Sequence, residues 1–177
     1  MSEILDVYDI DGNRLDKQVR RDTDGLQEGE YLLFVDVWIV NSANQFLIQK
    51  RNENRELFPG FWQSSAIGAV RSGETGSQGA RREVEEELGI TLDMANAAMV
   101  NLMVNRFVAK NANALMATWL IKQDIDIKDV KLQEGEVSDA KWASLEEIKA
   151  LLDCRAFVPV IKQDLEACAK ALGMDQG

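Results

Sequence analysis

The sequence predicts a single α/β (α+β) domain with a mixed β-sheet, preceded by an N-terminal β-hairpin. Two apolar runs, 31–40 and 114–122, have the length and composition of strands in a buried sheet. Between them, a capping-box pattern and a following glycine bracket a predicted helix over 75–88. Apolar residues at helical spacing near the end of the chain predict another helix, which covers the sheet. Strand and helix patterns that alternate in this way favour one mixed domain.

The first residues carry a strand pattern over 4–10, an Asp-Gly-Asn turn and a short return strand. Turn residues of this kind close β-hairpins, so residues 1–30 are predicted to form a hairpin and a connector. The polar stretch 17–30 is interpreted as a solvated connector, and a substrate-facing arm is the alternative. Residues 31–177 then form the main part of a single domain.

The run YLLFVDVWIV (31–40) is apolar on both faces except at Asp36, as expected of a strand in the middle of a sandwiched sheet. A carboxylate in such a strand needs a partner or a wet cleft. Asp36 is therefore predicted to form a structural ion pair or a strand-end hydrogen bond, and a role in the functional site is the alternative. A second strand is predicted over 45–51, where it ends in Lys50 and Arg51.

Three acids are clustered on the predicted helix. Glu83, Glu86 and Glu87 stand at positions i, i+3 and i+4, beside the apolar stripe. Like charges at this spacing repel one another, so the cluster is unfavourable unless a cation neutralises it. Oxygen ligands suit a hard ion, Mg²⁺ or Mn²⁺, and the lack of histidine excludes an imidazole-bound zinc or copper site. The alternative is a solvated, charged helix face.

The remainder of the chain continues the mixed pattern. Strands over 99–109 and 114–122 are predicted around an intervening turn, which makes a second hairpin. A short strand over 139–143 precedes a capping box that begins a helix at Ser144. A last helix is predicted to begin near Pro159, whose fixed φ suits a first turn.

Composition excludes several classes of protein. No apolar run approaches the length of a membrane span, and a net charge of −10 argues against a general nucleic-acid binder. The first residues carry acids where a signal peptide would carry positive charge, so a cytoplasmic location is expected. Cys154 and Cys168 lack CxxC spacing and are interpreted as reduced packing residues.

The stretch from Gly68 to Ile90 matches a known signature at every fixed position. It resembles the Nudix box, which is a glycine, five residues of any kind, a glutamate, seven of any kind, and Arg-Glu-apolar-any-Glu-Glu-any-Gly-apolar. The chain is therefore identified as a member of the Nudix hydrolase superfamily. The resemblance implies a loop-helix-loop on an α/β/α sandwich that binds a divalent metal and splits a nucleoside diphosphate linked to another moiety.

The resemblance also implies roles for the residues of the box. The three clustered acids would bind metal, and one of them would help to activate water. Arg82 would act with them by orienting a glutamate through a charge-assisted hydrogen bond. Glu74 would brace the loop, and the backbone carbonyl at or beside Gly68 would complete the metal coordination.

Outside the box, the resemblance implies further candidates. Arg51 is expected to face the substrate's phosphates, and Lys50, on the opposite face of a regular strand, is a second substrate-binding candidate. Glu134 and Glu136 are candidates for an extra metal ligand or a general base. The expected partners are a small nucleotide or diphosphate substrate and Mg²⁺, with no nucleic acid or membrane. The substrate stays open, as does the oligomeric state, for which a homodimer is one alternative.

The N-terminal hairpin and the run 31–40 also resemble the branch related to isopentenyl-diphosphate isomerase. That isomerase uses a cysteine just before the box glycine, a histidine just after it and a Glu-x-Glu pair on a later strand. Here those places hold Ile67, Ala69, and Asn111 with Asn113. Protonation of a double bond needs an acid and a partner group, so a hydrolase is favoured. The alternatives are an isomerase of allylic diphosphates and a non-catalytic domain that binds a nucleotide.

Overall fold

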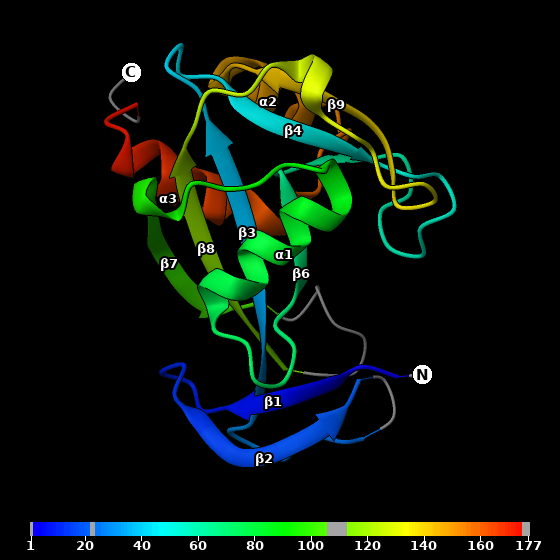
Figure 1. Ribbon diagram of the computed structural model, residues 1–177, viewed down its shortest axis with the longest axis vertical. Coiled ribbons are helices and arrows are strands. Elements are labelled where there is room, and N and C mark those ends of the chain that lie inside the picture. Colours follow the sequence, from blue (N-terminus) through cyan, green and yellow to red (C-terminus); the bar gives the residue numbers. More distant parts are fainter. Residues whose placement is uncertain (1, 22–23, 106–112, 175–177) are drawn as a thin grey trace.

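The computed structural model of the chain describes residues 2–21, 24–105 and 113–174. In this part of the chain, nine strands form one mixed sheet, accompanied by three α-helices and short 3₁₀ turns (Figure 1). The strands are β1 Ile4–Tyr8, β2 Arg14–Arg20, β3 Tyr31–Val40, β4 Phe46–Arg51, β5 Trp62–Gln63, β6 Ala66–Ala69, β7 Ala97–Val104, β8 Ala114–Lys122 and β9 Val137–Ala143. The helices are α1 Gly76–Leu88, α2 Leu145–Asp153 and α3 Lys162–Ala171.

Strand β3 is the centre of the sheet. It pairs in parallel with β8 along its whole length, from Leu32 opposite Ala114 to Val40 opposite Lys122. Three strands pair with it antiparallel, β1 at its beginning, β6 in its middle and β4 at its end. Because neighbours and helices surround it, β3 is buried on both faces, as its apolar run predicts.

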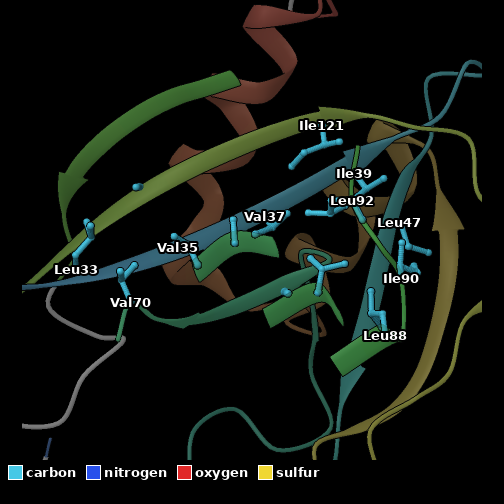
Figure 2. Packing of buried hydrophobic residues seen from close by; sticks show 14 of the residues in the cluster. Leu33, Val35, Val37, Ile39, Leu47, Val70, Leu88, Ile90, Leu92 and Ile121 are labelled. Carbon is cyan, nitrogen blue, oxygen red and sulfur yellow. The ribbon is translucent and has the colours of Figure 1, made fainter. Parts of the chain in front are cut away.

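Helices cover both faces of this sheet. On one face, α1 packs Ala80, Val84 and Leu88 against the apolar side chains that β3 presents there (Figure 2). On the other face, α2 and α3 pack against a second cluster that includes Trp38 and Phe46. Figure 1 shows α1 in front of β3 and β8, with α3 behind them. The α/β/α sandwich with a mixed sheet is thus confirmed.

Local sequence signals fixed the helix ends. Thr75 caps α1 through a reciprocal capping box with Gln78, and Gly89 ends the helix at φ 66° in the left-handed region. Ser144 caps α2 in the same way. The chain turns at a 3₁₀ segment, Pro159–Ile161, before α3 begins at Lys162. These predicted helices are confirmed, with the last one starting slightly later than expected.

The strands differ more from expectation. β2 extends to Arg20, so the polar connector is shorter than predicted, because pairing of Val19 with Leu5 buries one face of a mostly polar strand. β9 begins at Val137, two residues early. The predicted strand end and turn over 106–112 lie outside the described residues.

The two cysteines divide between surface and core. Cys168 is buried in the cluster beneath α3, as expected of a packing residue, and burial raises the pKa of its thiol. Cys154 is exposed, so the prediction that it packs in the core is wrong. It follows the last turn of α2, where the periodic apolar face of the helix has ended. None of the helices in the described segments has the length and apolar character needed to cross a membrane.

Candidate active site

Two acids of α1 face the strands β6 and β4, Glu83 and Glu87 respectively. Position 68 on β6 lies so close to Glu83 that a Cβ there would be 2.0 Å from the carboxyl carbon. Glu87, one turn further along, accepts a hydrogen bond from Gln49 on β4. Since the apolar stripe of α1 packs against the sheet beside them, these acids are fixed at the edge of the core rather than freely solvated.

Arg82 joins the loop before α1 to the acids on the helix. Its guanidinium forms two parallel hydrogen bonds with Glu74, at 2.7 Å and 2.9 Å, and a third with the carbonyl of Ala69 at 2.8 Å. Its Nη1 also donates to Glu83 Oε1 at 2.6 Å. Glu74 in turn accepts from the backbone N–H of Arg71 at 2.9 Å. The geometry therefore suits the roles that the box implies for Arg82 and Glu74.

Electrostatics distinguish the three acids. Burial raises the pKa of Glu83, although the hydrogen bond from Arg82 opposes that rise. Burial, followed by the nearby charge of Glu83, raises the pKa of Glu87 to about 8, and the hydrogen bond from Gln49 offsets only part of this. Glu86 is more exposed and lies 3.3 Å from Arg71. The site thus holds carboxyl groups that resist ionisation until an added positive charge compensates them.

Strand β4 delivers a glutamine and an arginine to the same side. Gln49 is 1% exposed and donates both to Glu87 and to the carbonyl of Ser65. Arg51, two residues on, is held by the carbonyl of Leu57 at 2.8 Å and by Gln63 at 2.9 Å. The negative charge of Glu87 acts on this guanidinium. Arg51 is therefore placed beside the acids, as the resemblance implies.

Lys50 lies on the opposite face of the strand. Lys50 pairs with Trp62 of the neighbouring strand β5. It stands two residues after Ile48 and so shares a strand face with it, and the side chain of Ile48 belongs to the core under α2 and α3. The structure thus brings Arg51, and not Lys50, to the acids of α1. A regular strand alternates its side chains, which is why only one of two adjacent bases faces the site.

Arg55 and Glu136 lie near Glu87 on the same side of the site as Arg51. The segment before β9 is tied to the end of α1, because Lys131 and Gln133 donate backbone hydrogen bonds to the carbonyls of Leu88 and Glu87. Glu136 consequently lies close enough to raise the pKa of Glu87, and it forms an ion pair with Arg55. Of the two acids proposed from this segment, Glu136 lies at the site.

The other proposed acid, Glu134, is exposed. Sequence reasoning missed Gln49 and Arg55 altogether. Gln49 could have been found, since it shares a strand face with Arg51, but no local pattern marks Arg55. Its position depends on how the 52–61 loop folds back on β4.

The site can be tested for its fit to a divalent cation. In the described part of the chain, no three acidic, histidine or cysteine side chains are already placed to share one ion. Arg82 holds Glu83 and Gln49 holds Glu87 by hydrogen bonds, so these two carboxylates must turn before they can coordinate one metal ion together. The donor set itself fits, because crowded carboxylates with a raised pKa gain most from a nearby cation. Position 68 lacks a side chain, and the carboxyl group of Glu83 occupies the space that a side chain there would take.

Asp36 differs from expectation. It lies mid-strand on the α3 side of the sheet, fully buried, and accepts from Trp38 Nε1 at 2.8 Å and from Ser64 Oγ. Its third partner is an acid, Asp164, and burial together with that acid raises its pKa well above the usual range. Among the described residues Asp36 forms no ion pair, so that prediction is wrong, and the hydrogen bonds that it accepts lie in mid-strand rather than at a strand end. Its raised pKa favours a protonated carboxyl beside Asp164.

The positions that correspond to the isomerase residues carry no matching chemistry. Ile67 and Ala69 lie on β6, paired with Asp36 and Phe34 of β3. Both side chains are apolar, so neither can act as an acid or a nucleophile beside Gly68. Asn111 lies outside the described residues.

Comparisons with known proteins agree with this geometry. The NUDIX domain model matches residues 31–162. An uncharacterized Nudix hydrolase of Listeria monocytogenes is 37% identical over 134 residues, covering 76% of each chain. An isopentenyl-diphosphate Δ-isomerase of Brevibacterium linens is 26% identical, covering 89% of this chain and 86% of its own. The resemblance drawn from the box is confirmed, as is the likeness to the isomerase branch.

Solved structures share the fold. DR0079 of Deinococcus radiodurans has a TM-score of 0.74 at 23% identity, covering 94% of this chain and 99% of that one. The NUDIX domain of Shewanella oneidensis NrtR, solved with ADP ribose, has a TM-score of 0.63 at 17% identity, covering 80% of this chain and 88% of that one. Hydrolases of the family generally use a divalent metal.

Proposed function

Because the chain belongs to the NUDIX family, we propose that it is a Mg²⁺-dependent hydrolase that cleaves the diphosphate linkage of a nucleoside diphosphate derivative or a related small metabolite. The observation that carries the proposal is the group of carboxylates at the end of α1, two of them with a raised pKa, directly beside Arg51. Such a group suits a cation and a phosphate chain together. The cytoplasm, where such metabolites and Mg²⁺ occur together, is the proposed place of the reaction.

The residues of the site would have different roles in metal binding and positioning. Glu83, Glu86 and Glu87 would hold Mg²⁺, and the bound ion would supply positive charge for the phosphate oxygens and a more acidic water. Arg82 keeps Glu83 in place through its hydrogen bond. Gln49 does the same for Glu87.

The two arginines of the β4 side would meet the substrate. Arg51 and Arg55 both lie near Glu87, so their guanidinium groups can pair with phosphate oxygens as negative charge builds on the leaving group. Glu136 is paired with Arg55 and is released when that arginine turns to a phosphate. A carboxylate of the group then accepts the proton of the attacking water.

A substrate panel tests the proposal. The purified protein is incubated with ADP-ribose, nucleoside di- and triphosphates, dinucleoside polyphosphates, a coenzyme and isopentenyl diphosphate, each with and without Mg²⁺. Phosphate-containing products are then measured. We expect Mg²⁺-dependent hydrolysis of at least one nucleotide derivative. Isomerisation of isopentenyl diphosphate without hydrolysis, or tight binding without turnover, would replace the proposal with one of its two alternatives.

A further inference from the structure

The N-terminal hairpin contacts the loop that leads into α1. Figure 1 shows this loop, Arg71–Thr75, reaching down to β1 and β2. Ser72 donates a backbone hydrogen bond to the carbonyl of Ile4 at 3.0 Å, which docks the loop on the edge of the hairpin. The two segments are more than fifty residues apart in the sequence, so only the tertiary fold brings them together.

Asp6 is the centre of this contact. Its carboxylate accepts hydrogen bonds from the backbone N–H of Gly73 and from Ser72 Oγ, both at 2.9 Å. On the hairpin side it accepts from Gln18 at 3.1 Å and lies 3.3 Å from the guanidinium of Arg14. Asp6 is 3% exposed, so each of these donors is aimed at a nearly enclosed carboxylate.

The charge of Asp6 is stable in this position. Burial alone would raise the pKa of its carboxyl, but the hydrogen bonds from Gly73, Ser72 and Gln18 lower the pKa overall. The group is therefore ionised at neutral pH, and an ionised acceptor binds its donors more strongly than a neutral one.

From the loop, contacts continue to the acids of α1. Arg14 of the hairpin also donates to the carbonyl of Glu74 at 3.0 Å. The side chain of Glu74 receives two hydrogen bonds from Arg82, and Arg82 Nη1 donates to Glu83 at 2.6 Å. A connected series of hydrogen bonds thus runs from Asp6 and Arg14, through Glu74 and Arg82, to Glu83.

A parallel connection reaches Glu86. Glu3, just before β1, accepts from Arg21 at 2.8 Å and from Arg71 Nε at 3.0 Å. The same Arg71 lies 3.3 Å from Glu86. Both connections begin on the hairpin and end on acids of the cluster. A contact that served only to cover the edge of the sheet would not need to reach these acids.

We propose that Asp6 is a positioning residue, through which the N-terminal hairpin fixes the loop before α1 and thereby the orientation of Arg82 and Glu83. The inference rests on the proposed function, because the purpose of that orientation is to present Glu83 to a cation. It makes the hairpin part of the active-site scaffold instead of an appendage to the domain.

Substitution of Asp6 tests the inference without substrate. We expect Asp6→Asn to weaken Mn²⁺ binding about five- to tenfold in a titration followed by electron paramagnetic resonance, somewhat less than for groups that touch a metal ligand directly. The amide of Gly73 should exchange its hydrogen about tenfold faster, because it loses a charged acceptor. With Mg²⁺, kcat should fall more than KM changes.

Two further variants support the comparison. Asp9→Asn is the matched control, since Asp9 lies in the same hairpin and its carboxylate accepts hydrogen bonds within its own turn, from Asp11 and Asn13. Ser72→Ala removes the hydroxyl that donates to Asp6 and accepts from Gln18, and it should weaken Mn²⁺ binding by about two- to threefold. If Asp6→Asn does not fold, Ser72→Ala still tests the positioning role of the contact between the hairpin and the loop.

The outcomes separate the inference from the proposed function. Wild-type Mn²⁺ affinity and unchanged Gly73 exchange in both Asp6→Asn and Ser72→Ala would overturn the inference alone. Turnover of no substrate by a wild-type protein that binds Mn²⁺ would overturn the proposed hydrolysis, while the affinities of the variants still decide the role of Asp6. A wild-type protein that binds no Mn²⁺ would overturn both.

Discussion

Gly68 and Glu83 are packed so closely that a single methyl group on the glycine would lie 2.0 Å from the carboxyl carbon of the glutamate. Real non-bonded atoms do not approach to this distance, so any side chain at position 68 must displace Glu83. Position 68 therefore requires glycine because the carboxyl group of Glu83 occupies the space of a side chain, and not because the backbone adopts a positive φ.

The first prediction concerns this glycine. Gly68→Ala should weaken Mn²⁺ binding and lower kcat by at least about tenfold, because Glu83 is pushed from its place beside Arg82. Gly25→Ala is the control, since a Cβ there meets nothing within 4 Å. Metal titration and product release measure the effect. Activity of Gly68→Ala within about twofold of wild type would show that Glu83 does not bind the ion where we place it.

The second prediction concerns Glu87. Glu87→Gln should lower turnover by at least about a hundredfold with the fold intact. Glu85→Gln, an exposed change on the same helix, should leave turnover unchanged. Full activity in Glu87→Gln would remove the assignment of the metal-binding face.

The same variant carries a stability prediction for the metal-free protein. The folded-state pKa of Glu87, about 8, lies above its ordinary value of 4.5, so the folded state keeps its proton longer than the unfolded state. The free energy of unfolding therefore falls as pH rises through that window. Glutamine cannot ionise, so at a pH of about 9 Glu87→Gln should be more stable than wild type by about 1–2 kcal/mol, allowing for solvent screening. Urea titrations without metal measure this, and equal stability would contradict the raised pKa.

The third prediction concerns Arg55. Arg55→Ala should raise KM about tenfold at saturating Mg²⁺, because a charge-assisted hydrogen bond to a phosphate is lost. Arg81→Ala, on the exposed face of α1, provides a control for the loss of one positive charge. Steady-state kinetics on the best substrate of the panel measure both. A change in kcat alone would indicate that Arg55 acts by holding Glu136 and not by binding substrate.

The fourth prediction concerns the buried acid pair Asp36 and Asp164. Asp164 lies in the first turn of α3, where the helix favours a negative charge. Its buried Oδ2 has no hydrogen-bond partner among the described residues, and a protonated Asp36 beside it can donate a hydrogen bond to Asp164. The raised pKa of Asp36 means that the wild-type protein loses stability as pH rises above about 4 toward that pKa, at about 1.4 kcal/mol for each unit of the shift.

Asparagine cannot ionise, so it removes the pH dependence of this site, although its amide nitrogen cannot accept from Trp38 Nε1 as the carboxyl does. Asp36→Asn should therefore show a smaller fall in melting temperature than wild type as pH rises from about 4 toward the raised pKa. Asp139→Asn, at an exposed site, is the control. Parallel melting curves for wild type and Asp36→Asn would mean that the two carboxyl groups share no proton.

The sequence by itself determined the features that depend on neighbours in the chain. A capping box and a left-handed glycine define α1, because the groups that satisfy its ends lie within a few residues of them. The period of apolar residues determined which helix face packs, and the ten-residue run of β3 determined its central place. The spacing of the box assigned the family for the same reason, since a single helix turn places its acids together.

The tertiary structure alone decided which distant residues join that cluster. Glu136 and Arg55 reach Glu87 through loops, Asp6 reaches Gly73 across the hairpin, and Asp36 meets a second acid from α3. Local spacing carries no signal for such contacts, because they depend on how strands pair and loops close over the whole domain. For that reason the sequence predicted a β2 that was too short, and it predicted an ion pair at Asp36 that does not form. The burial of a residue depends on its packing partners and not on its neighbours in the chain.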